Sequence, residues 1–328
     1  MRAMTTLRGY GGSLMLVCLI SQFAHDGRAQ NYPAKPIRYI VSGSPGSGTD
    51  TLGRIMAERL GQVLGQQAVV ENHAGGGSNI AAEMVARAPA DGHTILQTTI
   101  TLAVNVTLYR KLNYDLVRDF LPVTRLATGP YIFLVHPSLP VKSIVDMIKL
   151  AKAKPGAIDY SSGGTGTATF LAAELFKGQA GVNLTHIPYK GGGPALTAVI
   201  SGEVPVHVAP VATGIPPMKQ GSVRALGVSS SKRLSLVPDI PTIAEAGVPG
   251  YETGNWYGLM VPAKTPRETA AIIRNAAIKI LNTPDVNKRL VDLGYVVIGD
   301  QTEEFAPYIK LEIDRLGKII RAFNLTAD

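Results

Sequence analysis

The sequence has a single cysteine, Cys18, among 328 residues. A lone cysteine excludes a disulfide framework, a cysteine-based zinc site and an iron–sulfur cluster. Charged residues make up 17% of the chain, and the lysines and arginines are scattered rather than clustered, although the formal net charge is +8. The clustered basic surface of a nucleic-acid-binding protein is therefore missing, and we expect no nucleic-acid partner.

Motifs of catalysis and of nucleotide binding are missing as well. The histidines are isolated in sequence, without an HExxH pair, and there is no Gly-x-Ser-x-Gly elbow. No glycine loop ends in Lys-Ser or Lys-Thr, which excludes a P-loop, and the loop 46–51 lacks the last glycine of the dinucleotide fingerprint. Ser229 and Lys232 match a Ser-x-x-Lys pair without any supporting motif. We therefore expect a protein that is not an enzyme and that has no metal and no cofactor.

Long apolar runs are missing too, and one short run lies near the N-terminus. Residues 1–29 resemble a secretory signal, with two arginines at the start, the apolar run 14–20 and a small-x-small cleavage sequence at 27–29. The run is shorter than the ~20 residues that span a bilayer. We therefore expect removal of residues 1–29, a periplasmic location, and a mature chain without membrane insertion.

Short β-branched runs alternate with longer helical stretches after residue 32, which predicts an α/β fold with largely parallel strands. Trp256, the only tryptophan, lies in an apolar strand and is expected in the core. The expected strands are 37–41, 68–71, 94–97, 123–135, 158–161, 184–188, 204–208, 223–228, 256–261 and 295–298. The expected helices are 50–64, 79–88, 143–153, 167–178, 194–200, 266–281, 284–293 and 302–323.

The alternation restarts in the middle of the chain, which indicates two sheets and two domains. Two apolar stretches flank Thr128-Gly129-Pro130, where one strand is expected to run from the first domain into the second. A Gly/Pro-rich stretch near Gly254 marks a second crossing, so the C-terminal part is expected to return to the first domain. The expected lobes are therefore residues 30–128 plus 254–328 for lobe 1 and residues 129–253 for lobe 2.

Glycine-rich loops stand where four of the expected strands lead into helices, two in each half of the chain. In open α/β sheets ligands bind beyond the carboxyl ends of the strands. Glycine lets a ligand approach the backbone there, and the free N–H groups of the next helix favour an anion. A structural alternative is that the loops are turns, with Asp50, Asn79 and Thr167 as helix caps. The loops are 43–50, 75–79, 162–167 and 191–193.

An ordered set of short motifs resembles the Bug family, the TctC-like periplasmic substrate-binding proteins of tripartite tricarboxylate transporters. The resemblance covers essentially the whole chain after the signal. The motifs are Ile40-Val41, Gly46 to Asp50, Glu71-Asn72, Gly75 to Gly77, Ala90 to Thr94, Ser162 to Gly166, Pro188 to Gly191, Asn255 to Gly258 and Val261 to Ala263.

This resemblance implies a type II periplasmic-binding-protein fold, with two α/β lobes around a ligand cleft. It implies a small organic carboxylate as ligand, held largely by backbone amides and hydroxyls. Tyr189 and Lys190 precede a glycine loop, and they either touch the ligand or line a domain surface. The expected ligand-binding residues are Ser44, Gly48, Thr49, Asp50, Gly77, Ser78, Asn79, Thr98, Ser162, Gly164, Thr165, Tyr189, Lys190 and Gly191.

Two departures from the family pattern concern the ligand. Phe170 stands where the family often has histidine, and Pro205 stands where an aspartate is common. If both lie near the second-lobe loops, that side of the cleft is less polar than usual, and a carboxylate with an apolar or aromatic body is favoured.

We therefore expect a periplasmic solute-binding protein that delivers a small carboxylate to membrane transporter subunits and acts as a monomer. Two other functions stay open. One is a periplasmic sensor subunit for a signalling receptor, which would use the same cleft. The other is a periplasmic hydrolase, which would need a nucleophile and a base that meet in space.

Overall fold

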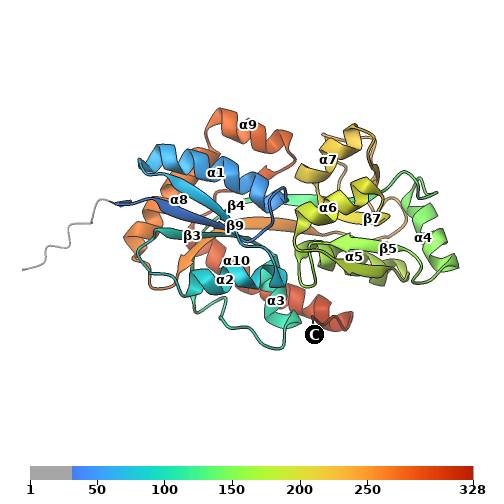
Figure 1. Ribbon diagram of the computed structural model, residues 1–328, viewed down its shortest axis with the longest axis horizontal. Coiled ribbons are helices and arrows are strands. Elements are labelled where there is room, and N and C mark those ends of the chain that lie inside the picture. The colour runs from blue at the N-terminus through green and yellow to red at the C-terminus, as the bar shows by residue number, and fades with distance from the viewer. Residues whose placement is uncertain (1–31, 328) are drawn as a thin grey trace, which may run out of the picture. The chain divides into compact units, whose positions relative to one another are not determined.

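The computed structural model describes residues 32–327, so the expected signal segment 1–29 lies outside the described residues. Within that range it is a mixed α/β structure (Figure 1). Its strands are β1 (Ile37–Val41), β2 (Ala68–Asn72), β3 (Thr94–Thr99), β4 (Phe120–Val135), β5 (Asp159–Ser162), β6 (Thr185–Pro188), β7 (Val206–Pro210), β8 (Arg224–Val228), β9 (Gly254–Pro262) and β10 (Val296–Val297). Its helices are α1 (Gly48–Leu64), the 3-10 turn η1 (Gly76–Ser78), α2 (Asn79–Ala86), α3 (Thr101–Leu108), α4 (Ile144–Ala153), α5 (Ala168–Ala180), α6 (Gly192–Ser201), α7 (Val211–Lys219), α8 (Arg267–Leu281), α9 (Pro284–Asp292) and α10 (Thr302–Ala322).

The strands form one path in the order β2-β1-β3-β9-β4-β7-β5-β6, with β8 and β10 also paired to β4. β4 is 16 residues long and belongs to both halves of this path. Its first part, up to Pro130, pairs with β9, and its second part, from Tyr131, pairs with β7 and β8. We call the strands β1–β3, β9, β10 and the first part of β4 the first lobe, and the remaining strands the second lobe. The residue at which one lobe ends stays a prediction.

The prediction of largely parallel strands is correct for only part of the sheet. β1 runs parallel to β2 and β3, and β5 runs parallel to β6 and β7. β4 and β9 are antiparallel to each other, and β9 is also antiparallel to β3. The reason is that these two strands carry the chain between the lobes in opposite directions, which the alternation of strands and helices does not reveal.

Apolar side chains fill the space between the sheet and its helices. Trp256 is 1% exposed and packs edge-on against Phe305 of α10, with ring centroids 5.4 Å apart, so its predicted place in the core is confirmed. In the second lobe Phe133 of β4 packs against Phe176 of α5 at 4.7 Å. Burying a large apolar side chain contributes roughly 2–3 kcal/mol. Within residues 32–327 no helix has the length and apolar character of a membrane span.

Two helices of the structure are missing from the sequence prediction. Half of the residues of α3 are β-branched threonine and valine, which have low helix propensity. α7 contains Pro216 and Pro217, which the sequence pattern treats as breaks. Both helices are held by tertiary packing instead, α3 against α10 and α7 against β4. Both also begin at the site described next.

Candidate ligand-binding site

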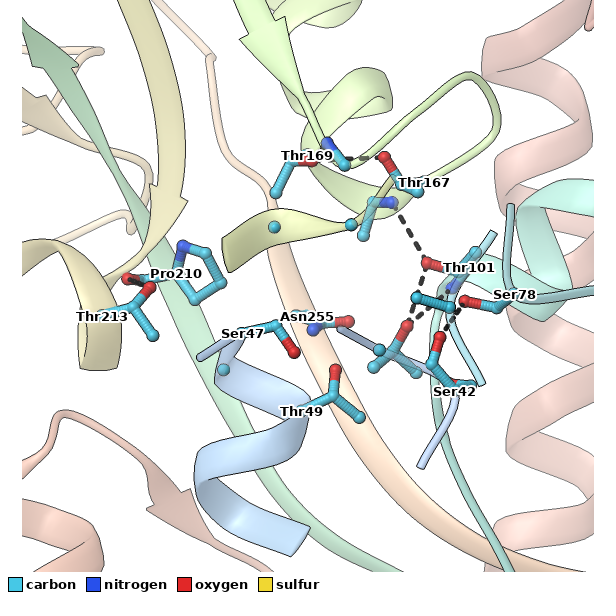
Figure 2. Close-up of a pocket in the computed structure, with 18 of the residues that line it drawn as sticks. Ser42, Ser47, Thr49, Ser78, Thr101, Thr167, Thr169, Pro210, Thr213 and Asn255 are labelled. Atoms are coloured by element: carbon cyan, nitrogen blue, oxygen red, sulfur yellow. Dashed lines mark hydrogen bonds between the residues drawn. The ribbon is translucent and has the colours of Figure 1, made fainter. Parts of the chain in front are cut away.

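A cavity of about 70 Å³ lies between the two lobes (Figure 2). Half of its lining residues carry a hydroxyl group, and none of the lining residues has an acidic or basic side chain. The lining residues are Ser42, Gly43, Ser47, Gly48, Thr49, Ala74, Gly75, Ser78, Thr99, Thr101, Tyr131, Gly163, Thr167, Ala168, Thr169, Gly191, Gly192, Pro210, Thr213 and Asn255.

Several helices begin at this cavity. α1 begins there in the first lobe, and so does the shorter α3. From the second lobe come the first residues of α5, α6 and α7. The first turn of a helix has backbone N–H groups without a partner inside the helix, and the helix dipole places partial positive charge there. Here some of them, such as those of Asp50 and Ala168, donate to hydroxyl groups. A cavity lined by several such turns, and by no carboxylate, favours an anion.

The loop that joins β1 to α1, residues 42–47, forms one wall of the cavity. Ser47 caps α1 by accepting a hydrogen bond from the backbone N–H of Asp50 at 3.2 Å. Ser78 donates its hydroxyl hydrogen to the carbonyl oxygen of Ser42 at 2.9 Å. These contacts hold the loop against the turn before α2, so that both face the same space (Figure 2). The caps of these two helices are Ser47 and Ser78, not Asp50 and Asn79 as the structural alternative proposed.

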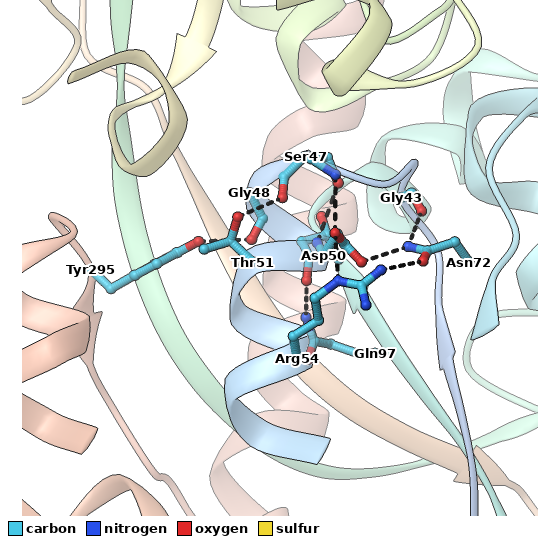
Figure 3. Close-up of polar contacts among 11 residues, drawn as sticks. Gly43, Ser47, Gly48, Asp50, Thr51, Arg54, Asn72, Gln97 and Tyr295 are labelled. Carbon is cyan, nitrogen blue, oxygen red and sulfur yellow. Dashed lines mark hydrogen bonds and ion pairs between the residues drawn. The ribbon is translucent and has the colours of Figure 1, made fainter. Parts of the chain in front are cut away.

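Asp50 does not line the cavity, and its carboxylate holds this loop by hydrogen bonds (Figure 3). Its buried carboxylate accepts a hydrogen bond from the backbone N–H of Gly46 at 3.0 Å and one from the amide of Asn72 at 2.9 Å. The guanidinium of Arg54 lies 3.0 Å from the same carboxylate. The asparagine amide also donates to the carbonyl oxygen of Gly43 at 2.9 Å. The arginine compensates the negative charge, which would otherwise oppose an anion in the cavity.

The second-lobe residue Ser162 lies beside a histidine but outside the cavity lining. Its hydroxyl is 2.6 Å from Nε2 of His186 and accepts a hydrogen bond from the N–H of Gly164 at 3.1 Å. Burial lowers the pKa of His186 to about 4, so its imidazole is neutral at pH 7. A hydroxyl and a base meet here, but Ser162 is fully buried and does not line the cavity. The pair is therefore structural.

Phe170 packs against the same histidine, with ring centroids 4.8 Å apart, and does not line the cavity. Pro205 does not line it either. The expectation that these two residues make the second-lobe side of the cleft apolar is therefore wrong. The cavity wall on that side is built instead from the hydroxyl residues Thr167, Thr169 and Thr213, from glycines, and from Ala168 and Pro210.

The two lobes touch through hydrogen bonds and backbone contacts beside the cavity. The backbone N–H of Gly193 donates to the hydroxyl of Ser44 at 3.1 Å, and the N–H of Ala168 donates to the hydroxyl of Thr101 at 3.1 Å. A Cβ atom on Gly193 would overlap the carbonyl oxygen of Pro45. The structure is therefore a closed arrangement, in which the lobes approach as closely as glycine allows.

The cavity brings together only part of the predicted set of ligand-binding residues. The predicted residues in its lining are Gly48, Thr49, Ser78 and Gly191. Ser44 lies in the contact between the lobes, and so does Thr165, whose carbonyl oxygen accepts from the Tyr109 hydroxyl at 3.2 Å. The predicted residues outside the lining are Asp50, Gly77, Asn79, Thr98, Ser162, Gly164, Tyr189 and Lys190. For every member of the set, contact with a ligand stays a prediction.

Several residues of this last group have other partners in the structure. Asn79 accepts a hydrogen bond from the Tyr114 hydroxyl at 2.7 Å. Tyr189 donates its hydroxyl hydrogen to Glu203 at 2.7 Å, and Lys190 is exposed. Of the two interpretations of the Tyr189-Lys190 pair, this placement favours the surface one.

Sequence reasoning missed other lining residues for two reasons. Thr101 and Thr213 come from α3 and α7, the two helices that the sequence does not predict. Tyr131 and Asn255 lie on β4 and β9, one residue beyond Pro130 and Gly254. The expected crossings near Gly129 and Gly254 could have predicted Tyr131 and Asn255. Where the chain passes from one lobe to the other, its residues lie next to the space between the lobes.

Comparison with known proteins identifies the family. Residues 52–325 match the model described as the tripartite tricarboxylate transporter family receptor (TctC). The chain is 36% identical over 302 residues to the UPF0065 protein in the tcbD-tcbE intergenic region of Pseudomonas sp. strain P51, covering 92% of this chain and 90% of that protein. It is 30% identical over 295 residues to the protein BugT of Bordetella pertussis, covering 89% of this chain and 90% of that one.

Solved structures agree with this assignment. Rpa4515 of R. palustris with adipate has 33% sequence identity and a TM-score of 0.87, and the match covers 90% of this chain and 99% of that one. MatC from Rhodopseudomonas palustris with bound malate has 30% identity and a TM-score of 0.85, over 88% of this chain and 100% of that one. The chain therefore belongs to the TctC family of tripartite tricarboxylate transporter receptors, as the resemblance to Bug proteins predicted, and it is a two-lobed solute-binding protein rather than an enzyme.

Proposed function

We propose that this protein captures a small organic carboxylate between its two lobes in the periplasm and delivers it to a tripartite tricarboxylate-type transporter. The observation that carries the proposal is the meeting of several helix N-termini at one cavity whose lining has no acidic or basic side chain. The charge of a bound anion is then met by backbone N–H groups and hydroxyls. Two similar proteins hold adipate and malate, which are carboxylates of this kind.

Within this class, the lining favours a compact polar acid over one with an aromatic body. Hydroxyl groups of the lining such as those of Ser47 and Thr101 accept hydrogen bonds from the backbone and keep a hydrogen that a ligand oxygen can accept. A buried hydroxyl that faces an apolar group without a partner costs ~1–3 kcal/mol. We therefore expect malate or citrate to bind more tightly than benzoate, the reverse of the expectation based on Phe170 and Pro205.

A thermal-shift panel with succinate, malate, adipate, citrate and benzoate tests the function. A ligand present at a hundred times its Kd stabilises the folded protein by ~2.7 kcal/mol, so its binding raises Tm. Succinamide serves as the control, because it keeps the carbon skeleton of succinate and lacks its charge. A panel in which none of the acids raises Tm, or in which succinamide acts as well as succinate, would contradict the proposal.

We also propose that residues 1–29 are removed on export and that the mature protein is a monomer with lobe 1 at residues 30–128 plus 254–328 and lobe 2 at 129–253. Mass spectrometry of periplasmic protein checks the first point, with Gln30 expected as the new N-terminus. Size-exclusion chromatography with light scattering checks the second, and a stable dimer contradicts it. Limited proteolysis between the lobes, followed by sequencing of the fragments, checks the boundaries.

A further inference from the structure

Tyr131 lies where β4 leaves the first lobe. Its register partner in β7 is Pro210, and its neighbour Pro130 pairs with Gly254 of β9. The side chain is 1% exposed, and the residue belongs to the lining of the cavity. It is therefore a tyrosine placed between the lobes, beside the space that a ligand would fill, and it lies outside the four glycine-rich loops.

The hydroxyl of this tyrosine is buried and has no hydrogen-bond partner among the described residues. Other buried tyrosines do have partners. Tyr251 donates to the carbonyl oxygen of Ala172 at 2.8 Å, and Tyr295 donates to that of Gly48 at 2.7 Å. A buried hydroxyl without a partner lowers stability, so a partner is expected in the functional state.

The polar neighbours of Tyr131 in the lining are engaged elsewhere. Asn255 accepts a hydrogen bond from the backbone N–H of Ile100 at 3.4 Å. Thr213 donates its hydroxyl hydrogen to the carbonyl oxygen of Pro210 at 3.1 Å. A molecule in the cavity can supply the partner that these side chains do not. Burial raises the pKa of the Tyr131 hydroxyl well above its usual value, so the group remains a hydrogen-bond donor.

We propose that the Tyr131 hydroxyl donates a hydrogen bond to a carboxylate oxygen of the bound ligand, an inference that rests on the proposed function. Tyr131 thereby becomes a specificity-determining residue at the junction of the lobes. A ligand that places an acceptor oxygen beside β4 satisfies the hydroxyl, and a ligand that places a methylene group there leaves it unpaired. The remaining charge of the ligand is met by the helix N-termini.

The proposal predicts opposite effects of Tyr131→Phe on stability and on binding. Without ligand the variant loses a buried group that has no partner, so its Tm should equal or exceed that of the wild type. With ligand it loses a charge-assisted hydrogen bond, so its Kd should rise about ten- to a hundredfold. A residue that only supports the fold would lower Tm instead.

Calorimetric titration of the wild type and of Tyr131→Phe with succinate, malate, adipate, citrate and benzoate tests this. Tyr251→Phe is the matched control: it removes a buried hydroxyl that has a partner, and it should lower Tm while leaving Kd within about twofold. We expect the loss of affinity in Tyr131→Phe for every acid that the wild type binds.

Three outcomes overturn the proposal. They are an unchanged Kd, a loss confined to the hydroxy acids malate and citrate, and a Tm below that of the wild type in the absence of ligand. A wild type that binds none of the five acids refutes the proposed function itself. A wild type that binds them with the same Kd as Tyr131→Phe refutes only the role of Tyr131.

Discussion

Ser78 combines a backbone constraint with a place in the cavity wall. Its φ is +69°, in the left-handed region that glycine, asparagine and aspartate adopt more readily than other residues. The side chain is buried, and its hydroxyl anchors the carbonyl oxygen of Ser42. Because asparagine and aspartate both tolerate this backbone, the position allows charge to be changed separately from shape.

We predict that Ser78→Asp abolishes carboxylate binding and that Ser78→Asn weakens it far less. Two like charges about 5 Å apart repel by ~3 kcal/mol at an effective dielectric constant of 20, which corresponds to more than a hundredfold in Kd. The two substitutions are nearly identical in size and differ in charge and in the amide that can donate to the Ser42 carbonyl oxygen. Their Tm values without ligand show whether the loss of that donor disturbs the fold. Isothermal titration with malate and succinate measures it. Equal losses in the two variants would mean that the cavity does not select an anion.

Individual lining residues were predictable only where a glycine loop marked them. Gly48, Thr49 and Gly191 follow directly from the loops at strand ends, because such loops approach ligands in open sheets. Asp50 stood in the same loop, yet its carboxylate points to Arg54 and Asn72. The direction of a side chain within a loop depends on partners that are distant in sequence, and a single sequence does not disclose them.

The N-terminus of α6 and the β1–α1 loop form the tightest contact between the lobes. Gly193 lies inside the helix with ordinary backbone angles, and it approaches Pro45 so closely that a Cβ atom does not fit. Its neighbour Gly192 has space, because a Cβ there would lie 3.6 Å from the nearest atom, the Cβ of Ser47. Although the two glycines are adjacent, only at Gly193 would a side chain prevent the lobes from approaching this closely.

We predict that Gly193→Ala hinders closure without harming the fold. Alanine is a better helix former than glycine, so Tm without ligand should be unchanged or higher. The clash with the Pro45 carbonyl makes the closed arrangement rarer, and apparent affinity falls in proportion, by about tenfold or more. Titration with succinate gives the affinity, and small-angle X-ray scattering should show a smaller ligand-induced contraction than in the wild type.

Gly192→Ala is the control for this experiment. Its Cβ meets an ordinary contact distance, so at saturating succinate we expect a ligand-induced contraction like that of the wild type. Its Kd is not compared, because Gly192 lines the cavity. If the two alanine variants contract alike, the approach of Gly193 to Pro45 does not limit closure.

Most helices and strands could be located from the sequence, and the exceptions have a common cause. Strands such as β1 and helices such as α8 have apolar residues at the period of their own element, and their bounds lie within a few residues of the prediction. α3 and α7 contradict their local propensities, and packing against the rest of the protein decides their conformation. The antiparallel pairing of β4 and β9 depends likewise on the whole chain.

At the scale of the whole molecule, buried histidines connect stability to pH. His207 is 1% exposed, its Nδ1 lies 3.0 Å from the carbonyl oxygen of Ser161, and burial lowers its pKa to about 4. Burial likewise lowers the pKa of His186 to about 4. In the unfolded chain both would bind a proton near pH 6.5. Between pH 6.5 and 4 the unfolded state therefore holds more protons than the folded state.

We predict that the free energy of unfolding falls as the pH is lowered from 6.5 to 4. The buried His207 accounts for up to about 3 kcal/mol of this loss. Urea unfolding at a series of pH values measures it. His207→Asn should be less stable than the wild type at pH 7.5 but should lose less stability on acidification, and adding His186→Asn should flatten the profile further. If the free energy of unfolding of the double variant falls with pH as steeply as that of the wild type, other groups cause the acid sensitivity.

β9 is synthesised long after the strand β3 with which it pairs. β9 lies between β3 and β4 in the sheet, yet it begins at residue 254, whereas β3 ends at residue 99. During synthesis the strands β4 to β8 are therefore complete before the strand that closes the first lobe exists. Until then the edges of β3 and of the first part of β4 have no partner, and such edges invite pairing with other chains. A chain truncated after residue 253 would contain β4 to β8 and lack β9, so its first lobe would keep two unpaired strand edges and be prone to aggregation.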